Sequence, residues 1–457
     1  MKVSLRSVHL VGCGGSGMSG LARLLHGHGV HVTGSDLVAT ATVGALRELG
    51  IDVQIGHRPR LPALQDGWVI RSAAIPDDNP EVAEARRRRL PCLLYSEAVG
   101  SLSTQCRTIA VAGTHGKTST TALTVSALRA SGHDPSYLVG GEVFDLPGNG
   151  HGGTDDLFVV EACEFNRSFH ALRPTFAAIL NLDSDHFDCY PRPEDLEESF
   201  ANYARNLRHG GTLLINEDVP DVVLHGLPAD VRVIRVGSKL FADLRAIDVE
   251  EVRGCYAFTP SHSGRRLPRV SLQLPGAFQV LNALFALSLA IEAGADPEAA
   301  CHGLSECHGV ARRFQVWRGD HGGQLVDDYA HHPAEIRAVL ATVRKAFPDR
   351  GILVAFQPHQ HSRTRHLLDQ FGEALALADS CLVSDIYAAR EDPSLDHGVR
   401  AEDVVTAVKQ AGGSAAAAGP VTLLGQRILS EMEPGSIPVV LGAGELDGVV
   451  QEVVRSI

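Results

Sequence analysis

A glycine-rich loop after an apolar strand is the strongest chemical signal in the sequence. The loop consists of Gly113, Thr114, His115, Gly116, Lys117, Thr118 and Ser119. It follows a strand expected at 108–112 and precedes a helical run, as in a P-loop, although Val111 stands where the strict pattern has its first glycine. Such loops hold phosphates on backbone N–H groups, the lysine reaches the β- and γ-phosphates, and the next hydroxyl ligates Mg²⁺. The loop therefore predicts ATP and Mg²⁺ as cofactors, with Lys117 catalytic and Thr118 on the metal.

Acidic residues and a histidine follow the next two expected strands. Glu161 ends the apolar run Leu157–Glu161, and His186 comes shortly after a run at 177–182. A parallel sheet presents the carboxyl ends of its strands at one edge, so these side chains are expected beside the phosphate loop. Both are candidate Mg²⁺ ligands, and His186 is alternatively a contact for the phosphoryl group in transfer. For either residue taken alone, a solvated acid or a structural histidine is the alternative.

A second glycine-rich turn lies near the N-terminus. Residues 12–17 match G-x-G-x-x-G after a strand at 8–11, and Asp36 ends the following strand. Taken alone, this pattern is typical of an NAD-dependent dehydrogenase, whose turn holds a pyrophosphate against a helix N-terminus. The same turn suits a UDP-linked substrate, because that molecule also carries a pyrophosphate. Both interpretations stay open at this point.

Two polar loops follow apolar strands in the last third of the chain. Loop 327–333 holds His331, and loop 357–363 holds His359 and Arg363. Such loops line the ligand-facing edge of an open sheet. The two histidines are candidate bases, and the guanidinium fork of Arg363 suits a carboxylate or a phosphate.

Apolar strands alternate with helices along the chain, which indicates an α/β fold with parallel sheets. A chain of 457 residues exceeds what one hydrophobic core usually supports, so several domains are expected. The expected domains are residues 1–105, 106–310 and 311–457. We expect a hinge at 309–314, a long apolar helix at 274–293 and another helix at 364–378.

Composition narrows the class of partner. The net charge of −13 repels phosphate backbones and anionic lipid, so no nucleic-acid or membrane-surface role is expected. No stretch reaches the ~20 apolar residues of a membrane span, and the N-terminus enters a strand without a signal-peptide pattern. We expect a cytoplasmic protein, monomeric or weakly homodimeric. The nine cysteines form no C-x-x-C pair and are expected to be free thiols.

Taken together and in order, the motifs resemble the Mur ligase family. They include VGCGGSGMSGLARLL, SAAIPDDNPEV, GTHGKTSTTAL, EACEFNRSFHALRP, NLDSDHFDCY, LPGAFQVLNAL, VDDYAHHPAEI and FQPHQHSRT. The resemblance implies a Rossmann-like N-terminal domain that binds UDP, a P-loop ATPase domain with a parallel sheet, and a Rossmann-like C-terminal domain that brings an amino acid. Within the family it points to the branch that joins L-alanine to UDP-N-acetylmuramate through an acyl phosphate.

The resemblance also implies roles for individual residues. Those expected on the UDP-sugar are Gly14, Gly15, Ser16, Ser35, Asp36 and Ser72. Asn282 resembles an adenine-contacting asparagine, whereas His331, His359 and Arg363 would face the amino acid and the reacting carboxylate.

The sequence departs from the family pattern in three motifs. Phe278 and Gln279 replace the start of His-Asn-x-x-Asn, Cys163 replaces an aspartate, and Gln360 replaces an arginine. No lysine lies between His186 and Lys239, where related ligases of later steps carry a carbamylated lysine, and this favours the alanine-adding branch. A sister ligase that attaches a tripeptide, an NAD-dependent dehydrogenase and a non-catalytic nucleotide-sugar sensor remain the alternatives.

Overall fold

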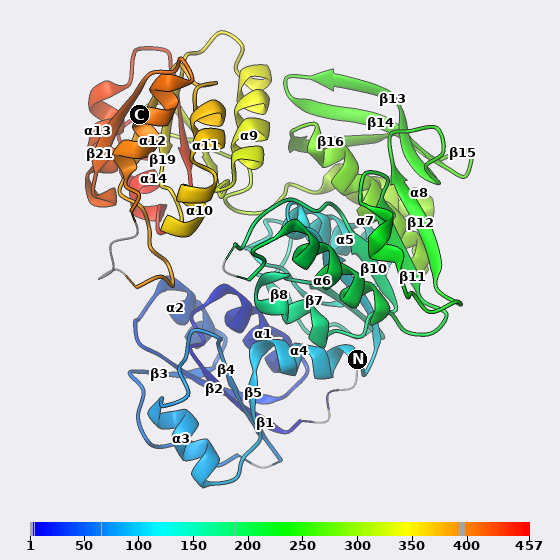
Figure 1. Ribbon diagram of the computed structural model, residues 1–457. Helices are drawn as coiled ribbons and strands as arrows, with labels where there is room; N and C mark the ends of the chain where they lie inside the picture. Colours follow the sequence, from blue (N-terminus) through cyan, green and yellow to red (C-terminus); the bar gives the residue numbers. More distant parts are fainter. Residues whose placement is uncertain (1–2, 4, 65, 188, 393–397) are drawn as a thin grey trace.

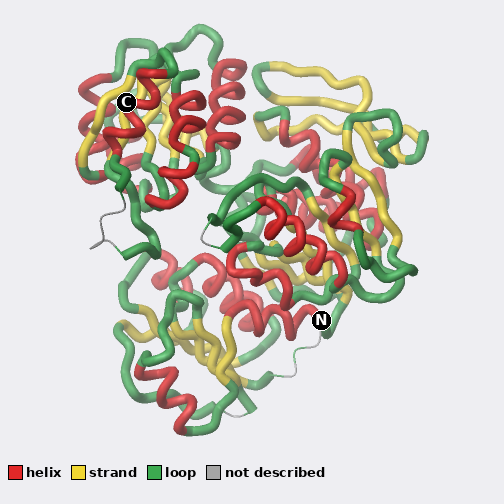
Figure 2. The backbone as a smooth tube through the Cα atoms, viewed as in Figure 1, coloured by secondary structure: helices red, strands yellow, loops and turns green. Residues whose placement is uncertain are grey.

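The computed structural model describes the whole chain except residues 1–2, 4, 65, 188 and 393–397. Its described residues form three β-sheets, one after another along the chain (Figure 1). Helices cover the sheets, as the colouring by secondary structure shows (Figure 2). Among the described residues, no helix is both long enough and apolar enough to cross a bilayer.

The N-terminal sheet is parallel, in the order β3-β2-β1-β4-β5. Its strands are β1 (Ser7–Val11), β2 (His31–Asp36), β3 (Asp52–Ile55), β4 (Trp68–Arg71) and β5 (Cys92–Leu94). The helices are α1 (Ser16–Gly27), α2 (Ala41–Glu48), α3 (Pro80–Arg87) and α4 (Tyr95–Ser103). All five residues of β1 are buried, which agrees with a central strand covered on both faces. The strand order reverses beside β1, where open α/β sheets bind ligands.

The central sheet carries the phosphate loop between β6 and α5. Its main strands are β6 (Arg107–Ala112), β7 (Ser136–Leu138), β8 (Gly150–His151), β9 (Leu157–Glu161), β10 (Phe176–Ile179), β11 (Thr212–Asn216) and β12 (Arg232–Gly237). The helices are α5 (Lys117–Ala130), η1 (Phe165–Ala171), α6 (Pro193–Arg205), η2 (Asp221–Leu224), α7 (Phe278–Ala293) and α8 (Pro297–Glu306). Strand β6 pairs in parallel with β9 on one side and β10 on the other. The three strand ends that the sequence singled out therefore lie side by side.

An antiparallel extension of this sheet was not anticipated from the sequence. It comprises β13 (Leu244–Val252), β14 (Cys255–His262), β15 (Arg265–Arg266) and β16 (Val270–Pro275). The helix expected at 274–293 was therefore wrong at its start, because Leu274 belongs to β16 and α7 begins at Phe278. Gly276 between them has φ +115°, a left-handed conformation that separates strand from helix.

The C-terminal sheet has the order β17-β18-β22-β19-β20-β21. Its strands are β17 (Gln315–Arg318), β18 (Gln324–Asp328), β19 (Ile352–Phe356), β20 (Ser380–Ser384), β21 (Ala415–Gly419) and β22 (Ile437–Leu441). The helices are α9 (Pro333–Ala346), α10 (His361–His366), α11 (Leu368–Leu375), α12 (Ala401–Gln410), α13 (Val421–Glu431) and α14 (Asp447–Val454). The single helix expected at 364–378 is wrong: α10 and α11 are separated at Leu367, whose φ of −112° is not helical.

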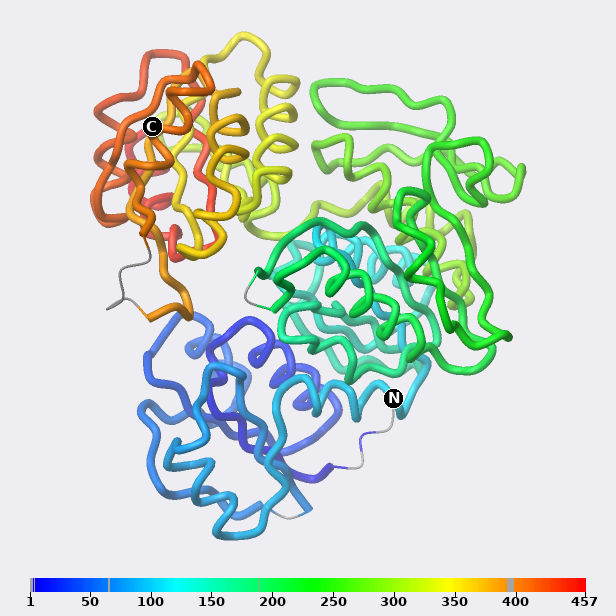
Figure 3. The backbone as a smooth tube through the Cα atoms, in the orientation of Figure 1, coloured from blue at the N-terminus to red at the C-terminus, as the bar shows by residue number. Residues whose placement is uncertain are grey.

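The N-terminal and central parts contact each other through closely packed backbone segments. Helix α1 packs on β7 and β8, and a Cβ atom added at Gly150 would overlap the carbonyl of Gly20. Gly27 and Gly152 make a second close approach. The C-terminal part instead begins after a connecting segment at residues 309–314 (Figure 3). Arg312 and Phe314 in this segment have positive φ.

Candidate active site

The phosphate loop depends on two glycines with positive φ. Gly113 has φ +144° and Gly116 has φ +84°, and a Cβ at Gly116 would lie 2.7 Å from Oδ1 of Asn282. The loop is also tied to the segment after β10: the backbone N–H of His115 donates to Oδ1 of Asn181 at 2.8 Å. Its shape is therefore fixed by the fold before any ligand binds.

Lys117 is held by an ion pair with a buried glutamate. Its Nζ lies 2.8 Å from Oε2 of Glu164, whose side chain is 2% exposed, and it donates to the carbonyl of Thr114 at 3.0 Å. Burial opposes charge on both groups, but their mutual attraction raises the pKa of Lys117 and lowers the pKa of Glu164. The ammonium group is thus charged and aimed at the loop, ready to neutralise phosphate oxygens.

Two of the three predicted metal ligands, Thr118 and Glu161, contact each other, whereas Nε2 of His186 lies beside Glu164. Oγ1 of Thr118 donates to Oε2 of Glu161 at 3.3 Å, and Glu161 also accepts from the backbone of Gly140. Burial raises the pKa of Glu161 and outweighs the N–H of Gly140 and the charges of Lys117 and Arg313, which lower it. Nδ1 of His186 is buried with no hydrogen-bond partner in the described part of the chain. The oxygens of Thr118 and Glu161 are the kind of donor that Mg²⁺ prefers, whereas an imidazole nitrogen is more typical of transition metals.

The C-terminal loops bring two neutral histidines to the same crevice. Their ring centroids lie 5.7 Å apart, and burial lowers the pKa of His331 to about 4 and that of His359 to about 3. Nδ1 of His331 faces the carbonyl of Tyr329 at 3.0 Å and must donate there, which leaves Nε2 with a lone pair. Nδ1 of His359 instead accepts from Arg363 at 2.9 Å. His331 is therefore the better placed base.

Arg363 does not match its expected role. Its Nε and Nη2 donate to the two carboxylate oxygens of Asp185 at 2.8 and 3.1 Å, and both side chains are buried. The guanidinium holds the pKa of Asp185 well below its usual range despite burial. A fork already filled by Asp185 has no free edge for a substrate carboxylate, so we correct the expectation that Arg363 clamps the amino acid. It joins the C-terminal part to the central part.

A cavity of about 270 Å³ opens at the N-terminal glycine-rich turn. Its lining includes Gly15, Ser16, Ser72 and Tyr95, together with Ser168 from the central part. Gly14 lies outside this lining, and its N–H donates to Asp36 at 2.7 Å. Ser35 is fully buried with its hydroxyl on Glu81, so its side chain does not line this cavity, although its carbonyl accepts from the glycine-rich turn at Gly12.

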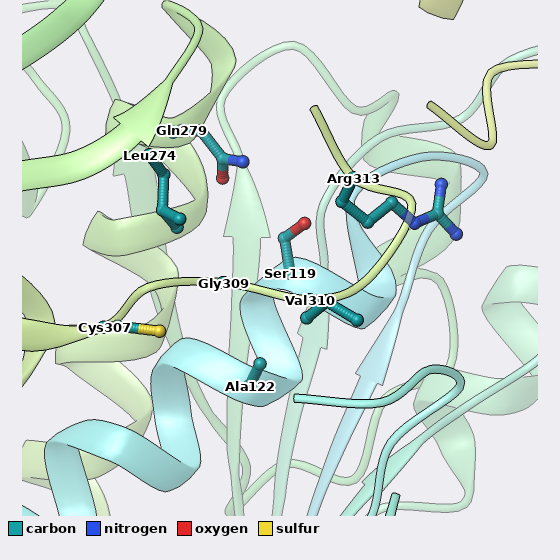
Figure 4. A pocket seen from close by; sticks show the side chains of 8 residues that line it. All are labelled: Ser119, Ala122, Leu274, Gln279, Cys307, Gly309, Val310 and Arg313. Carbon is teal, nitrogen blue, oxygen red and sulfur yellow. The ribbon is translucent and has the colours of Figure 1, made fainter. Parts of the chain in front are cut away.

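A second recess lies beside the N-terminus of α5 (Figure 4). Ser119, Gln279 and Arg313 line it, whereas Asn282 sits behind Gln279 and donates to its Oε1 at 2.9 Å. Arg313 also reaches Oγ1 of Thr118 at 3.5 Å. The sequence placed Arg313 in the expected hinge, and it was not predicted as a site residue. The feature that could have indicated its role is a charged side chain in a segment that connects two domains.

The fold and the site define an ATP-dependent ligase built from three α/β parts around a phosphate loop. Family models agree: the Mur ligase catalytic domain matches residues 7–107, the Mur ligase middle domain 111–290, and the Mur ligase glutamate ligase domain 312–444. The chain belongs to the Mur ligase family. The family and the fold class expected from the sequence are confirmed.

Individual relatives cover nearly the full length. The chain is 39% identical to a UDP-N-acetylmuramate–L-alanine ligase of Kineococcus radiotolerans, over 99% of this chain and 96% of the relative. It is 37% identical to the enzyme of that name from Rhodococcus opacus, over 98% and 95%. A crystal structure of UDP-N-acetylmuramate-alanine ligase from Thermotoga maritima matches with a TM-score of 0.81 and 27% identity, over 98% of both chains.

Proposed function

We propose that the chain joins L-alanine to UDP-N-acetylmuramate, using ATP and forming an acyl phosphate on the way. The observation that carries the proposal is a chain of contacts between the phosphate loop and the C-terminal part. Lys117 pairs with Glu164, which also faces His186. His186 faces Asp185, and Asp185 pairs with Arg363 next to His331. The relatives' names supply the two substrates. Neither a dehydrogenase nor a non-catalytic sensor requires a phosphate-loop lysine and a candidate base at the same site.

In the first half-reaction, the carboxylate of the sugar attacks the γ-phosphate of ATP. Lys117 stabilises the charge on the transferring group, and Arg313 supplies a second cation beside Thr118. Thr118, Glu161 and His186 would hold Mg²⁺, which supplies further neutralisation when bound. The bond between the γ-phosphorus and the oxygen that bridges it to the β-phosphate breaks, ADP leaves, and the acyl phosphate that remains must be shielded from water.

In the second half-reaction, the amine of L-alanine attacks the acyl carbon. Nε2 of His331 takes the proton of the amine, and phosphate leaves from a tetrahedral intermediate. The buried pair of Arg363 and Asp185 closes the crevice and excludes water. A pKa of about 4 keeps His331 unprotonated at neutral pH but makes it a weak base, so it takes the proton once the C–N bond has formed and the attacking nitrogen has become acidic.

Phosphate release tests the assignment. The protein with ATP, Mg²⁺ and UDP-N-acetylmuramate is offered a panel of amino acids and the tripeptide. We expect L-alanine to be preferred, with glycine or L-serine used detectably because Gln360 replaces an arginine. Preference for the tripeptide would assign the sister activity instead.

Glu161→Gln is expected to weaken the response to Mg²⁺ because it replaces the carboxylate that lies next to Thr118. The concentration for half-maximal activity should rise about 10-fold or more, the scale of losing one hard ligand charge. A Mg²⁺ titration of activity measures this, with Glu142→Gln as the control. An unchanged titration places the metal away from Glu161.

The cavity at the N-terminal turn is expected to bind UDP-N-acetylmuramate and not NAD. Calorimetry should use the full chain, because Ser168 of the central part completes the lining. Ser16→Trp should abolish the binding heat by filling the cavity, while ATP binding stays. NAD binding without UDP-sugar binding contradicts the assignment.

The domain boundaries 1–105, 106–310 and 311–457, the cytoplasmic location and the monomeric or weakly dimeric state stay predictions.

A further inference from the structure

His115 lies on the phosphate loop, and its side chain joins two parts of the molecule. Its Nδ1 is 2.9 Å from Oε1 of Glu335, which stands in the first turn of α9 in the C-terminal part. Its Nε2 is 3.3 Å from Oδ2 of Asp183, in the segment that follows β10. One imidazole ring thus connects the nucleotide loop to carboxylates from both sides of the crevice.

Glu335 extends the connection to the candidate base. Its Oε2 accepts from the backbone N–H of His331 at 3.0 Å and from that of His332 at 3.3 Å, at the start of α9. The two oxygens of one carboxylate therefore hold the phosphate loop and the loop that carries His331. A shift of the C-terminal part would break the contact to His115, whereas Glu335 and the His331 loop would move together.

The neighbouring carboxylates favour a protonated ring on His115. Burial alone would lower the pKa of His115, but Glu335 and Asp183 raise it to about 9. His332 also faces the ring, at 4.9 Å between centroids, and its own pKa is lowered by burial and by His115. An imidazolium donates from both nitrogens, and both carboxylates are placed to accept.

A divalent cation is the other occupant to consider, because His115, Asp183 and His332 present ligand atoms within 4.8 Å of one another. Both nitrogens of His332 already have partners: Nδ1 accepts from Ala334 at 3.3 Å and Nε2 faces the carbonyl of Ser184 at 3.2 Å. The cluster satisfies its hydrogen bonds without an ion. The observations therefore favour the proton over a metal.

We propose that His115 is a positioning residue that couples docking of the C-terminal part to the phosphate loop, through the chain Asp183, His115, Glu335 and the backbone of His331. The proposal rests on the ligase function proposed above. The coupling places the base for the amine only when the C-terminal part is docked on the phosphate loop. Chemistry on the amine is thereby tied to an assembled nucleotide site.

A double-mutant cycle tests the coupling. His115→Asn and Glu335→Gln are made singly and together; Glu335→Gln keeps an acceptor oxygen for the N–H groups of His331 and His332, so the start of α9 is retained. Each single variant should lower kcat/KM for alanine about tenfold while KM for ATP changes less than about twofold. The double variant should again be about tenfold down, because the second change removes a contact that is already lost.

Lys345→Gln is the matched control. Lys345 also sits on α9 and donates to the hydroxyl of Tyr256 of the central sheet at 2.7 Å, so it joins the same two parts away from the phosphate loop. Its activity should stay within about twofold of wild type. Asp183→Asn gives a second route to the same result if a variant of His115 fails to fold.

Three outcomes would overturn the proposal. The first is multiplication of the two single effects, and the second is an equal rise of KM for ATP. The third is one Zn²⁺ per chain that survives dialysis in wild type and is lost in His115→Asn, which would make the cluster a metal centre. A wild type that releases no phosphate with alanine fails the proposed function instead, so the two failures are distinguishable.

Discussion

Lys117→Ala is expected to lower turnover by about 10²–10³-fold, the scale for removing one pre-organised charge from a transferring group. The loss should fall on kcat, because the ammonium acts most strongly on charge that develops during transfer. Phosphate release at saturating substrates measures it. Near-normal turnover would mean that phosphoryl transfer takes place elsewhere.

The same change should also destabilise the fold, because it strands the buried carboxylate of Glu164. Loss of one partner from a buried pair costs about 3–5 kcal/mol, although Nε2 of His186 at 3.5 Å can compensate in part. The double variant Lys117→Ala with Glu164→Gln separates the two effects. It should recover most of the melting temperature and none of the turnover.

Arg363→Ala is expected to lower kcat/KM for all three substrates by about 10²–10³-fold. The change leaves Asp185 charged and buried where the C-terminal part docks, and about 3–5 kcal/mol is lost from the closed arrangement. Steady-state kinetics with each substrate varied in turn measures the loss. The sequence alone had led us to expect an effect on the amino acid only.

Two further variants test whether the loss in Arg363→Ala comes from breaking the pair with Asp185. Arg363→Lys keeps the charge without the fork and should lose less activity than Arg363→Ala. Adding Asp185→Ala to Arg363→Ala should cost less than the product of the single losses, since no unpaired charge remains. A rise confined to KM for alanine would return Arg363 to the role of carboxylate clamp.

The sequence could predict the phosphate loop and its neighbours because local rules determine them. Apolar runs end in β6, β9 and β10, glycines take the left-handed positions at Gly113 and Gly116, and parallel pairing brings the strand ends together. Residues that act at such ends can be found without knowing the rest of the fold.

Contacts between distant segments could not be predicted in this way. No local pattern assigns the fork of Arg363 to Asp185, 178 positions away, or places Arg313 beside Thr118. The strand β16 was misread because Leu274 was grouped with the apolar residues of α7, whereas β16 is a strand that pairs with β14. In each case the deciding partner comes from elsewhere in the chain.

The glycine contacts between α1 and β8 have a consequence for how the molecule can be re-engineered. Because the backbones touch at Gly20 and Gly150, the N-terminal and central parts cannot shift relative to each other there. The proposed sites for the acceptor sugar and for the nucleotide therefore keep a fixed spacing. The remaining part follows a short joint at 309–314 and docks through a small number of polar contacts, among them those of Arg363 and Glu335. The C-terminal part of a related ligase could accordingly be joined after residue 310 to change which amine is used. If the contacts of Arg363 and Glu335 are kept, the spacing between the sites for the sugar and for ATP stays unchanged.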